Sequence, residues 1–170
     1  MSDDKVADVL SRYSGPVTLY PSRKKWLFLF GVCALFSAGG FAMVWDGEPT
    51  GWFVLGLFGL AAIIPLVVLV PGSTWLELNV DGFEYKTLFN GRRVRWGDSD
   101  HFGVARIPPA NHALVVYDDD AVRDTKSAAL NARLTGRTSL LGDNYGLTVA
   151  GLANLMAQWR ERALGQSGPR

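Results

Sequence analysis

Two long uncharged stretches dominate the first half of the chain, with a short acidic turn between them. The first runs from Trp26 to Trp45 and holds 20 residues, and the second runs from Trp52 to Val70 and holds 19. As a helix, either stretch would cover about 30 Å, the thickness of the hydrocarbon core of a bilayer. Two buried helices of a soluble bundle are the alternative, but soluble core helices seldom run this far without a polar face. We therefore predict a transmembrane helical hairpin over residues 23–70, with helices at about 25–45 and 52–70.

The turn VWDGEPTGW is so short that it can only connect the two helices of this hairpin. Its two acids, Asp46 and Glu48, belong in water on one side of the bilayer. Amphipathic indoles are enriched at membrane interfaces, so we expect the tryptophans near the ends of both stretches to act as interface anchors. These are Trp26, Trp45, Trp52 and Trp75.

Small residues recur within both stretches at intervals of about three or four, which would let the two helices approach closely. They are Gly31, Ala34, Ala38 and Gly39 in the first stretch and Gly56, Gly59 and Ala62 in the second. Ordinary membrane-helix composition, rich in glycine and alanine, is the alternative explanation. Neither stretch carries the intramembrane charge that would favour a channel or transport subunit.

Three consecutive basic residues, Arg23, Lys24 and Lys25, precede the first stretch, whereas the turn has acids and no base. Lys and Arg are enriched on the cytoplasmic side of membrane helices. The chain is therefore predicted to be a multi-pass protein of the cell (inner or plasma) membrane, with both termini in the cytoplasm and membrane lipids around its two crossings.

After Pro71 the pattern changes to short runs typical of strands. Residues 74–80 alternate apolar and polar positions, and further strands are predicted at 83–89 and 92–96. Asp-Gly and Asn-Gly pairs at 81–82 and 90–91 are strong hairpin turns, so these strands form an antiparallel meander.

Two more strands are predicted at 101–107 and 113–118, a short helix at 125–136, and a returning strand at 138–142. Residues 147–164 form the clearest helix of this part, and Thr148 is suited to cap it. One apolar stripe on that helix should close over the open face of the sheet, and its members are Leu152, Leu155, Met156 and Trp159.

The chain is thus predicted to have four segments. Residues 1–22 are a cytoplasmic tail with a short strand near its end, 23–70 the hairpin, 71–165 a cytoplasmic domain, and 166–170 a disordered tail.

A meander of curved strands closed by one amphipathic C-terminal helix resembles the pleckstrin-homology-like (PH-like) fold. The segments LYPSRKK, LNVDGFEYKTLFNGRRVRWGD and NYGLTVAGLANLMAQWRERA together resemble bacterial membrane-anchored PH-like domain proteins of uncharacterised function, over about Val17 to Ala163. The resemblance implies an α+β membrane protein: a two-helix transmembrane hairpin followed by a PH-like antiparallel β-barrel or sandwich closed by the helix. It supplies no catalytic residues. PH domains often bind phosphoinositides through basic residues around their first hairpin loop, but that loop here is Asp81-Gly82 with Glu84 nearby.

Composition narrows the function classes further. The formal net charge is +1, which gives no case for nucleic-acid binding. The only cysteine, Cys33, lies inside the first apolar stretch, so an internal disulfide and a cysteine metal cluster are excluded. No glycine-rich phosphate loop opens a helix after a strand. We predict no cofactor and no metal.

The candidates for catalysis are few. His101 and His112 lack a partner spacing typical of a metal site, and we expect both to be surface or strand-edge residues. The acids Asp118, Asp119 and Asp120 lack the alternating ligands of a calcium loop, so a solvated turn at a strand end is the favoured interpretation. The prediction is that the protein is not an enzyme.

One electrostatic feature is left, a basic strand beside the Asn-Gly turn. If Val94 and Trp96 face the core, Arg93 and Arg95 share the outward face. Together with the basic residues before the hairpin they would meet anionic headgroups at about 1 kcal/mol per charge; the alternative is a solubilising edge strand. The candidate lipid- or partner-binding residues are Arg23, Lys24, Lys25, Lys86, Arg92, Arg93 and Arg95.

These features favour a non-enzymatic membrane-anchored module that presents a cytoplasmic surface to lipid headgroups or to a membrane or cytoplasmic protein partner. The alternative is a cytoplasmic-face enzyme acting on lipid or envelope precursors, which would need a pocket joining His101, His112 and Asp118–Asp120.

Overall fold

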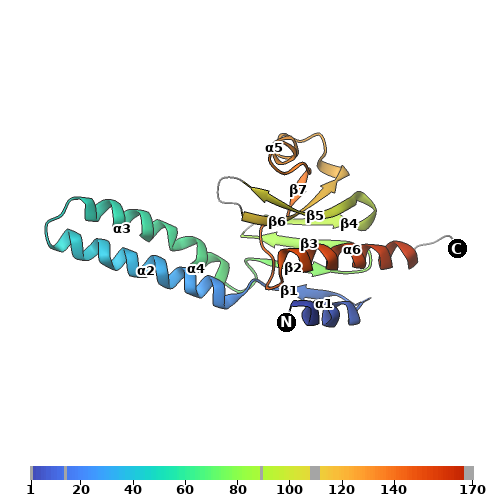
Figure 1. The fold of residues 1–170 in the computed structure, drawn as a ribbon, viewed down its shortest axis with the longest axis horizontal. Coiled ribbons are helices and arrows are strands. Elements are labelled where there is room, and N and C mark those ends of the chain that lie inside the picture. Colours follow the sequence, from blue (N-terminus) through green and yellow to red (C-terminus); the bar gives the residue numbers. More distant parts are fainter. Residues whose placement is uncertain (1, 14, 89, 108–111, 167–170) are drawn as a thin grey trace. The chain divides into compact units, whose positions relative to one another are not determined.

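The computed structural model describes residues 2–13, 15–88, 90–107 and 112–166 (Figure 1). The chain divides into two compact units. A hairpin unit comprises Pro21–Thr74, and a sheet unit comprises Met1–Tyr20 together with Trp75–Arg170. Most of the tail predicted to be disordered, 167–170, lies outside the described residues.

The hairpin unit consists of α2 (Arg23–Trp45), α3 (Thr50–Ala61) and α4 (Ile63–Leu69). Both apolar stretches are therefore helical, and both are long and apolar enough to cross a membrane, with mean hydropathies of 2.2 for α2 and 2.6 for α3 and α4 together. The break between α3 and α4 lies three residues before Pro65, which has no N–H to donate to the helix turn preceding it.

The two arms of the hairpin meet along a regular seam. Five of the seven buried or half-buried positions of α2 recur at alternating steps of three and four residues, as in the seam of a two-stranded coiled coil. These five are Phe30, Cys33, Ser37, Gly40 and Val44, and the other two are Trp26 and Val32.

Two glycines at the turn end of this seam set the closest approach of the helices. A Cβ on Gly40 would lie 2.6 Å from the backbone nitrogen of Leu55, and a Cβ on Gly51 would lie 2.6 Å from that of Val44. For the small residues singled out in the sequence, ordinary membrane-helix composition is the better explanation at three of the four glycines, because a Cβ there would meet open space. Those three are Gly31, Gly39 and Gly56.

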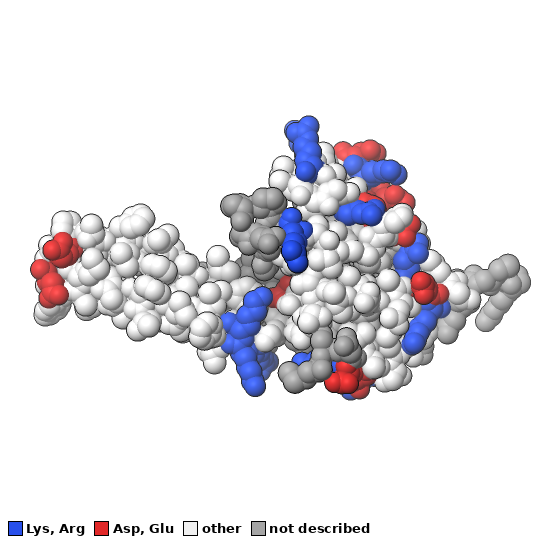
Figure 2. Space-filling view, in the orientation of Figure 1, with Lys and Arg blue, Asp and Glu red and all other residues white. Residues whose placement is uncertain are grey.

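The remaining faces of the hairpin are apolar and exposed. In the most apolar window of each arm only 11% and 6% of the residues are buried. Figure 2 shows an uncharged surface between the acidic tip, with Asp46 and Glu48, and the basic start of α2. Large exposed side chains of the hairpin unit include Phe28, Leu35, Phe41, Phe53, Leu57 and Leu60.

The sheet unit contains two antiparallel sheets with strand orders β1-β2-β3-β4 and β5-β6-β7. The strands are β1 (Val17–Leu19), β2 (Trp75–Leu78), β3 (Gly82–Thr87), β4 (Asn90–Arg95), β5 (Ser99–Ile107), β6 (His112–Asp119) and β7 (Ser139–Leu140). Short 3-10 turns, η1 (Trp96–Asp98) and η2 (Asp120–Val122), follow β4 and β6. The chain is thus α+β, with the predicted meander at its centre.

The hairpin is inserted between two strands that pair with each other. Leu19 near the end of β1 lies opposite Leu76 near the start of β2, so both connections to the hairpin leave the sheet at one end. The predicted division into a tail of residues 1–22 and a separate domain is therefore corrected. The N-terminal residues fold with the sheet unit because β1 completes its first sheet and α1 (Ser2–Ser11) buries apolar side chains in its core.

Helix α6 (Val149–Gln166) provides much of the core. All four residues of its predicted apolar stripe are fully buried, and the Thr148 hydroxyl caps its start by accepting a hydrogen bond from the Gly151 N–H at 3.1 Å. The Asn79 carbonyl oxygen accepts hydrogen bonds from two indoles, Trp96 at 2.9 Å and Trp159 at 3.0 Å. These bonds link the β2–β3 turn to η1 and to α6.

The short helix α5 (Lys126–Thr135) lies between β6 and β7 in the sequence (Figure 1). The Thr125 hydroxyl caps it by accepting from the Ala128 N–H at 3.2 Å, and Gly136 ends it in the left-handed conformation at φ 76°. Its start and stop are as predicted.

Candidate functional site

The predicted basic strand is β4, and alternation divides its arginines between two faces. Val94 and Trp96 are buried, as predicted, so Arg92 points inward with them while Arg93 and Arg95 are exposed. Arg92 forms an ion pair with the fully buried carboxylate of Asp119, with 2.7 Å between the guanidinium nitrogen and the carboxylate oxygen. This ion pair joins the two sheets, because Arg92 is on β4 and Asp119 is on β6. A ligand that binds Arg92 would have to compete with Asp119.

The outward arginines differ in their partners. The Arg93 side chain is 71% exposed and reaches Glu84 on β3 at 3.4 Å. Arg95 has no ion pair or side-chain hydrogen bond to another described residue. Both line a groove of about 440 Å³ with Val94 and with the β2–β3 turn. The turn residues in the groove are Asn79, Asp81 and Gly82.

The strand register places the basic residues at different distances from the hairpin connections. Lys86 lies opposite Trp75, where the chain enters β2 from the hairpin. Arg95 lies opposite Gly82, at the other end of the sheet. At about 3.4 Å per residue, the four steps from Gly91, opposite Lys86, to Arg95 span roughly 14 Å. The predicted basic set is therefore spread along the sheet.

The other predicted site residues belong mostly to the hairpin unit. Arg23, Lys24 and Lys25 are exposed in the first turn of α2, and the Lys25 ammonium lies 5.3 Å from the centroid of the Trp26 ring. Among the predicted interface anchors, Trp45 and Trp52 are exposed at the turn end of the hairpin. Trp75 is half-buried at the start of β2, in the sheet unit.

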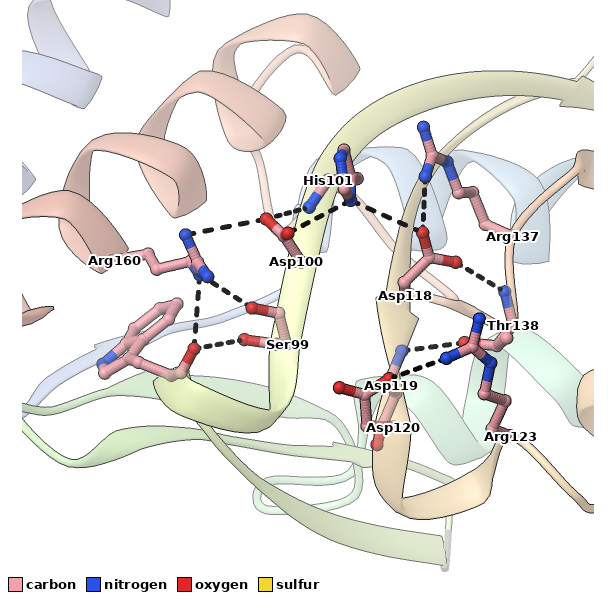
Figure 3. Close-up of polar contacts among 11 residues, drawn as sticks. Ser99, Asp100, His101, Asp118, Asp119, Asp120, Arg123, Arg137, Thr138 and Arg160 are labelled. Atoms are coloured by element: carbon pink, nitrogen blue, oxygen red, sulfur yellow. Dashed lines mark hydrogen bonds and ion pairs between the residues drawn. The ribbon is translucent and has the colours of Figure 1, made fainter.

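A second cluster gathers acids, a histidine and arginines where β5 and β6 pair (Figure 3). The sequence indicated His101 and Asp118 as candidates but not the arginines that join them. Asp100 on β5 lies opposite Asp118 on β6, and a bulge follows between Asp100 and Gly103. His101 in this bulge has φ 54°, an uncommon conformation for a residue with a side chain. We call Asp100, His101, Asp118, Arg137 and Arg160 the acid–histidine cluster.

Ion pairs connect this cluster. His101 Nδ1 lies 3.2 Å from an Asp100 carboxylate oxygen and 3.7 Å from Asp118. Arg137 pairs with Asp118, and Arg160 on α6 lies 3.6 Å from Asp100. The hydrogen bond from the His101 backbone N–H lowers the pKa of Asp100, with the nearby Arg160, His101 and Arg137 charges acting in the same direction.

The cluster borders an open hollow of about 610 Å³ beside α5. Its lining residues are Asp100, His101, Asp118, Asp120, Arg123, Ala128, Ala129, Ala132, Gly136 and Thr138. His101 is 61% exposed there, as expected of a strand-edge histidine. The side chain of His112 lies outside the described residues, so the pocket joining both histidines that the enzyme alternative requires is not tested.

The interpretation of the three consecutive acids as a solvated turn is corrected. Only Asp120 is largely exposed, 3.6 Å from Arg123. Asp118 is held by Arg137, and Asp119 is fully buried beside Arg92. Burial raises the pKa of Asp119, although Arg92 and the Ala121 N–H oppose that shift.

The chemistry available in the hollow is limited. His101 beside two carboxylates is the arrangement of a general base. The hydroxyl on the lining, that of Thr138, already accepts from the Asp119 N–H at 2.7 Å. Over the described ranges, no group of three or more His, Cys, Asp or Glu side chains is arranged to hold a metal ion.

The chain was also compared with known proteins. No family model, curated protein or solved structure matches it. The resemblance to membrane-anchored PH-like proteins therefore stays a prediction, and function must be argued from the chain's own geometry.

Proposed function

We propose that this protein is a non-enzymatic, membrane-anchored PH-like module whose sheet unit presents a cytoplasmic surface for protein or lipid-headgroup interaction. The observation that carries the proposal is the exposed apolar face of the hairpin. A soluble helical hairpin buries its apolar stripe and exposes polar residues. Here the helices are apolar on the faces that they do not share.

That apolar surface needs a covering that the described part of the chain does not supply. Large hydrophobic side chains such as Phe28, Phe53 and Leu35 are 72–74% exposed. Leaving apolar area in water costs about 25 cal/mol per Å², and contiguous patches of this kind mark membrane or protein contacts. A lipid bilayer covers the whole length of both arms without any further protein.

Short connections would keep the sheet unit at the membrane surface. Residues 20–22 join β1 to α2, and residues 70–74 join α4 to β2. At about 3.3–3.6 Å per extended residue, the longer connection reaches no more than roughly 18 Å. Anchoring of this kind raises the concentration of the sheet unit for other membrane-bound molecules.

The PH-like part of the proposal is supported by strand count and order. A sheet of four strands, a sheet of three strands and a C-terminal helix in the core follow one another along the chain. The cytoplasmic side is supported by Arg23, Lys24 and Lys25 at the start of α2, opposite the acids of the turn.

Cysteine labelling tests this topology. Cys33→Ser removes the only cysteine, and Glu48→Cys or Arg123→Cys then adds one to the hairpin turn or to the sheet unit. In spheroplasts of a bacterial host, a membrane-impermeant maleimide should label position 48 at once and position 123 only after permeabilisation. Equal labelling of both positions before permeabilisation, or recovery of the protein in the soluble fraction, contradicts the proposal.

A second candidate function rests on the acid–histidine cluster. His101 combines a positive φ with two nearby carboxylates above a hollow, and backbone strain concentrates at functional sites. An enzyme of the cytoplasmic face acting on lipid or envelope precursors would use His101 as its base. Turnover of membrane-extract lipids that is lost in His101→Ala and kept in Arg133→Ala would favour this candidate over the first.

A further inference from the structure

We propose that the free edge of β4 binds an extended acidic segment of a partner protein as an additional strand. The partner's carboxylates would pair with Arg93 and Arg95. This inference rests on the proposed function, because it names the chemistry of the protein partner that the anchored module would bind.

β4 is the terminal strand of its sheet, and the register shows which of its backbone groups face the edge. The Trp96 N–H donates to the Asp81 carbonyl at 3.2 Å. In an antiparallel ladder this bond flanks a pair of residues that exchange no hydrogen bonds, here Gly82 and Arg95. Because the two kinds of pair alternate, Arg93 also points its N–H and carbonyl away from β3.

Most of these edge groups are available for a partner. No strand pairs with the outer side of β4 in the described part of the sheet unit, which leaves both backbone groups of Arg93 and the N–H of Arg95 open. The Arg95 carbonyl is used locally, because Arg95 is the N-cap of η1. An added strand is held through such unpaired groups, while pockets and charges for alternate side chains provide specificity. A partner strand would therefore form backbone hydrogen bonds at the same residues of β4 whose side chains carry the positive charge.

Charge complementarity identifies the occupant. Side chains of an added strand alternate between the two faces, so every second residue would stand beside Arg93 and Arg95 on the outward face. Arg95 has no acidic partner among the described residues, and Arg93 has only the partly exposed Glu84 at 3.4 Å. Acids at every second position of the partner would meet both arginines.

Two other occupants fit less well. A second copy pairing edge to edge through an antiparallel β4 would bring arginines against arginines, and such pairs repel. Anionic headgroups do not supply the alternating N–H and carbonyl groups of a strand, so they would pair with the arginine side chains and leave the edge of β4 unpaired.

The test uses the full chain in phosphatidylcholine nanodiscs and a fluorescein-labelled peptide with glutamate at every second position between valine and threonine. Fluorescence anisotropy should show saturable binding. A peptide with proline at a central position, which removes one edge hydrogen bond, should bind more weakly. Arg93→Glu with Arg95→Glu should weaken binding by at least about tenfold, whereas the matched surface change Arg123→Glu should leave it within about twofold.

A charge reversal makes the test specific. The doubly substituted protein should bind a peptide with lysine in place of glutamate, which a general loss of folding would not produce. Absence of binding by the glutamate peptide, equal binding of the proline peptide, or equal loss in Arg123→Glu overturns the proposal. If phosphatidylserine in the nanodisc abolishes peptide binding through Arg93 and Arg95, these arginines face lipid and the proposal also fails. The cysteine labelling above is independent of all these outcomes, so the anchoring proposal stands or falls separately.

Discussion

The hairpin unit and the sheet unit arrange their apolar residues in opposite ways. In the sheet unit the largest side chains are inside, with Trp96, Trp159 and Phe83 at most 1% exposed. In the hairpin unit large side chains such as Phe28 and Phe53 point outward. The glycines Gly40 and Gly51 lie at its seam instead.

The proposed insertion of the hairpin unit in lipid explains this difference. In water, burying an aromatic side chain is favourable because it removes a large apolar area from the solvent. Between helices in lipid that driving force is absent, and close packing across small residues holds the helices together. Similar hydrophobic residues would therefore form the core of the sheet unit and the lipid-facing surface of the hairpin unit.

The largest expected effect comes from truncating a tryptophan of the core. Trp159→Ala removes a fully buried indole and its hydrogen bond to Asn79. It should lower the free energy of unfolding of the sheet unit by about 3–5 kcal/mol. Hydrogen exchange of the full chain in nanodiscs should show lost protection across β2, β3 and α6. The matched change Phe53→Ala on the exposed hairpin face should leave exchange of the hairpin nearly unchanged, and equal losses would break the comparison.

A smaller effect is expected at two adjacent arginines of β4. Arg92→Ala leaves the carboxylate of Asp119 buried without its partner and should cost roughly 3 kcal/mol. Arg93→Ala removes an exposed ion pair and should cost less than about 1 kcal/mol. Urea unfolding of the sheet unit measures both. Similar costs at the two positions would mean that the buried pair does not join the sheets as described.

Two glycines of the hairpin unit allow a matched comparison between a position on the helix seam and a position in open space. Gly51→Ile places a side chain against the backbone of α2 and should destabilise the hairpin by about 1–3 kcal/mol. Gly56→Ile places the same side chain in open space and should change it little. Thermal loss of hairpin helicity in nanodiscs, followed by circular dichroism, distinguishes the two variants. If Gly56→Ile is the more damaging change, another seam holds the helices.

The smallest effect is a pH dependence from Asp119. Its pKa is raised in the folded state, so between the unfolded value of 3.8 and the folded value the native protein binds more protons than the unfolded chain. The contribution of Asp119 to stability is therefore fully present below pH 3.8 and is lost as the pH rises through the folded pKa. Asp119→Asn should flatten this decline in unfolding free energy measured across that window. An unchanged slope would assign the pH dependence to other carboxyl groups.

Local patterns in the sequence were sufficient to predict the individual helices, strands and turns. Uninterrupted apolar runs predicted α2 and the α3–α4 arm, Asp81-Gly82 and Asn90-Gly91 predicted the turns of the meander, and helical spacing predicted the buried stripe of α6. These signals hold because hydrophobic periodicity and turn chemistry act over a few residues. They also predicted that Arg93 and Arg95 face outward.

Contacts between distant segments were decided only in the tertiary structure. β1 pairs with β2 although a hairpin of about fifty residues separates the two strands in the sequence. The local pattern of residues 1–22 therefore gave no sign that this segment belongs to the sheet unit. Arg92 meets Asp119 where the two sheets pack, and His101 and Arg137 both meet Asp118 beside the paired strands β5 and β6. A register is set by packing of the whole sheet, and a shift of one residue would turn each of these side chains to the other face.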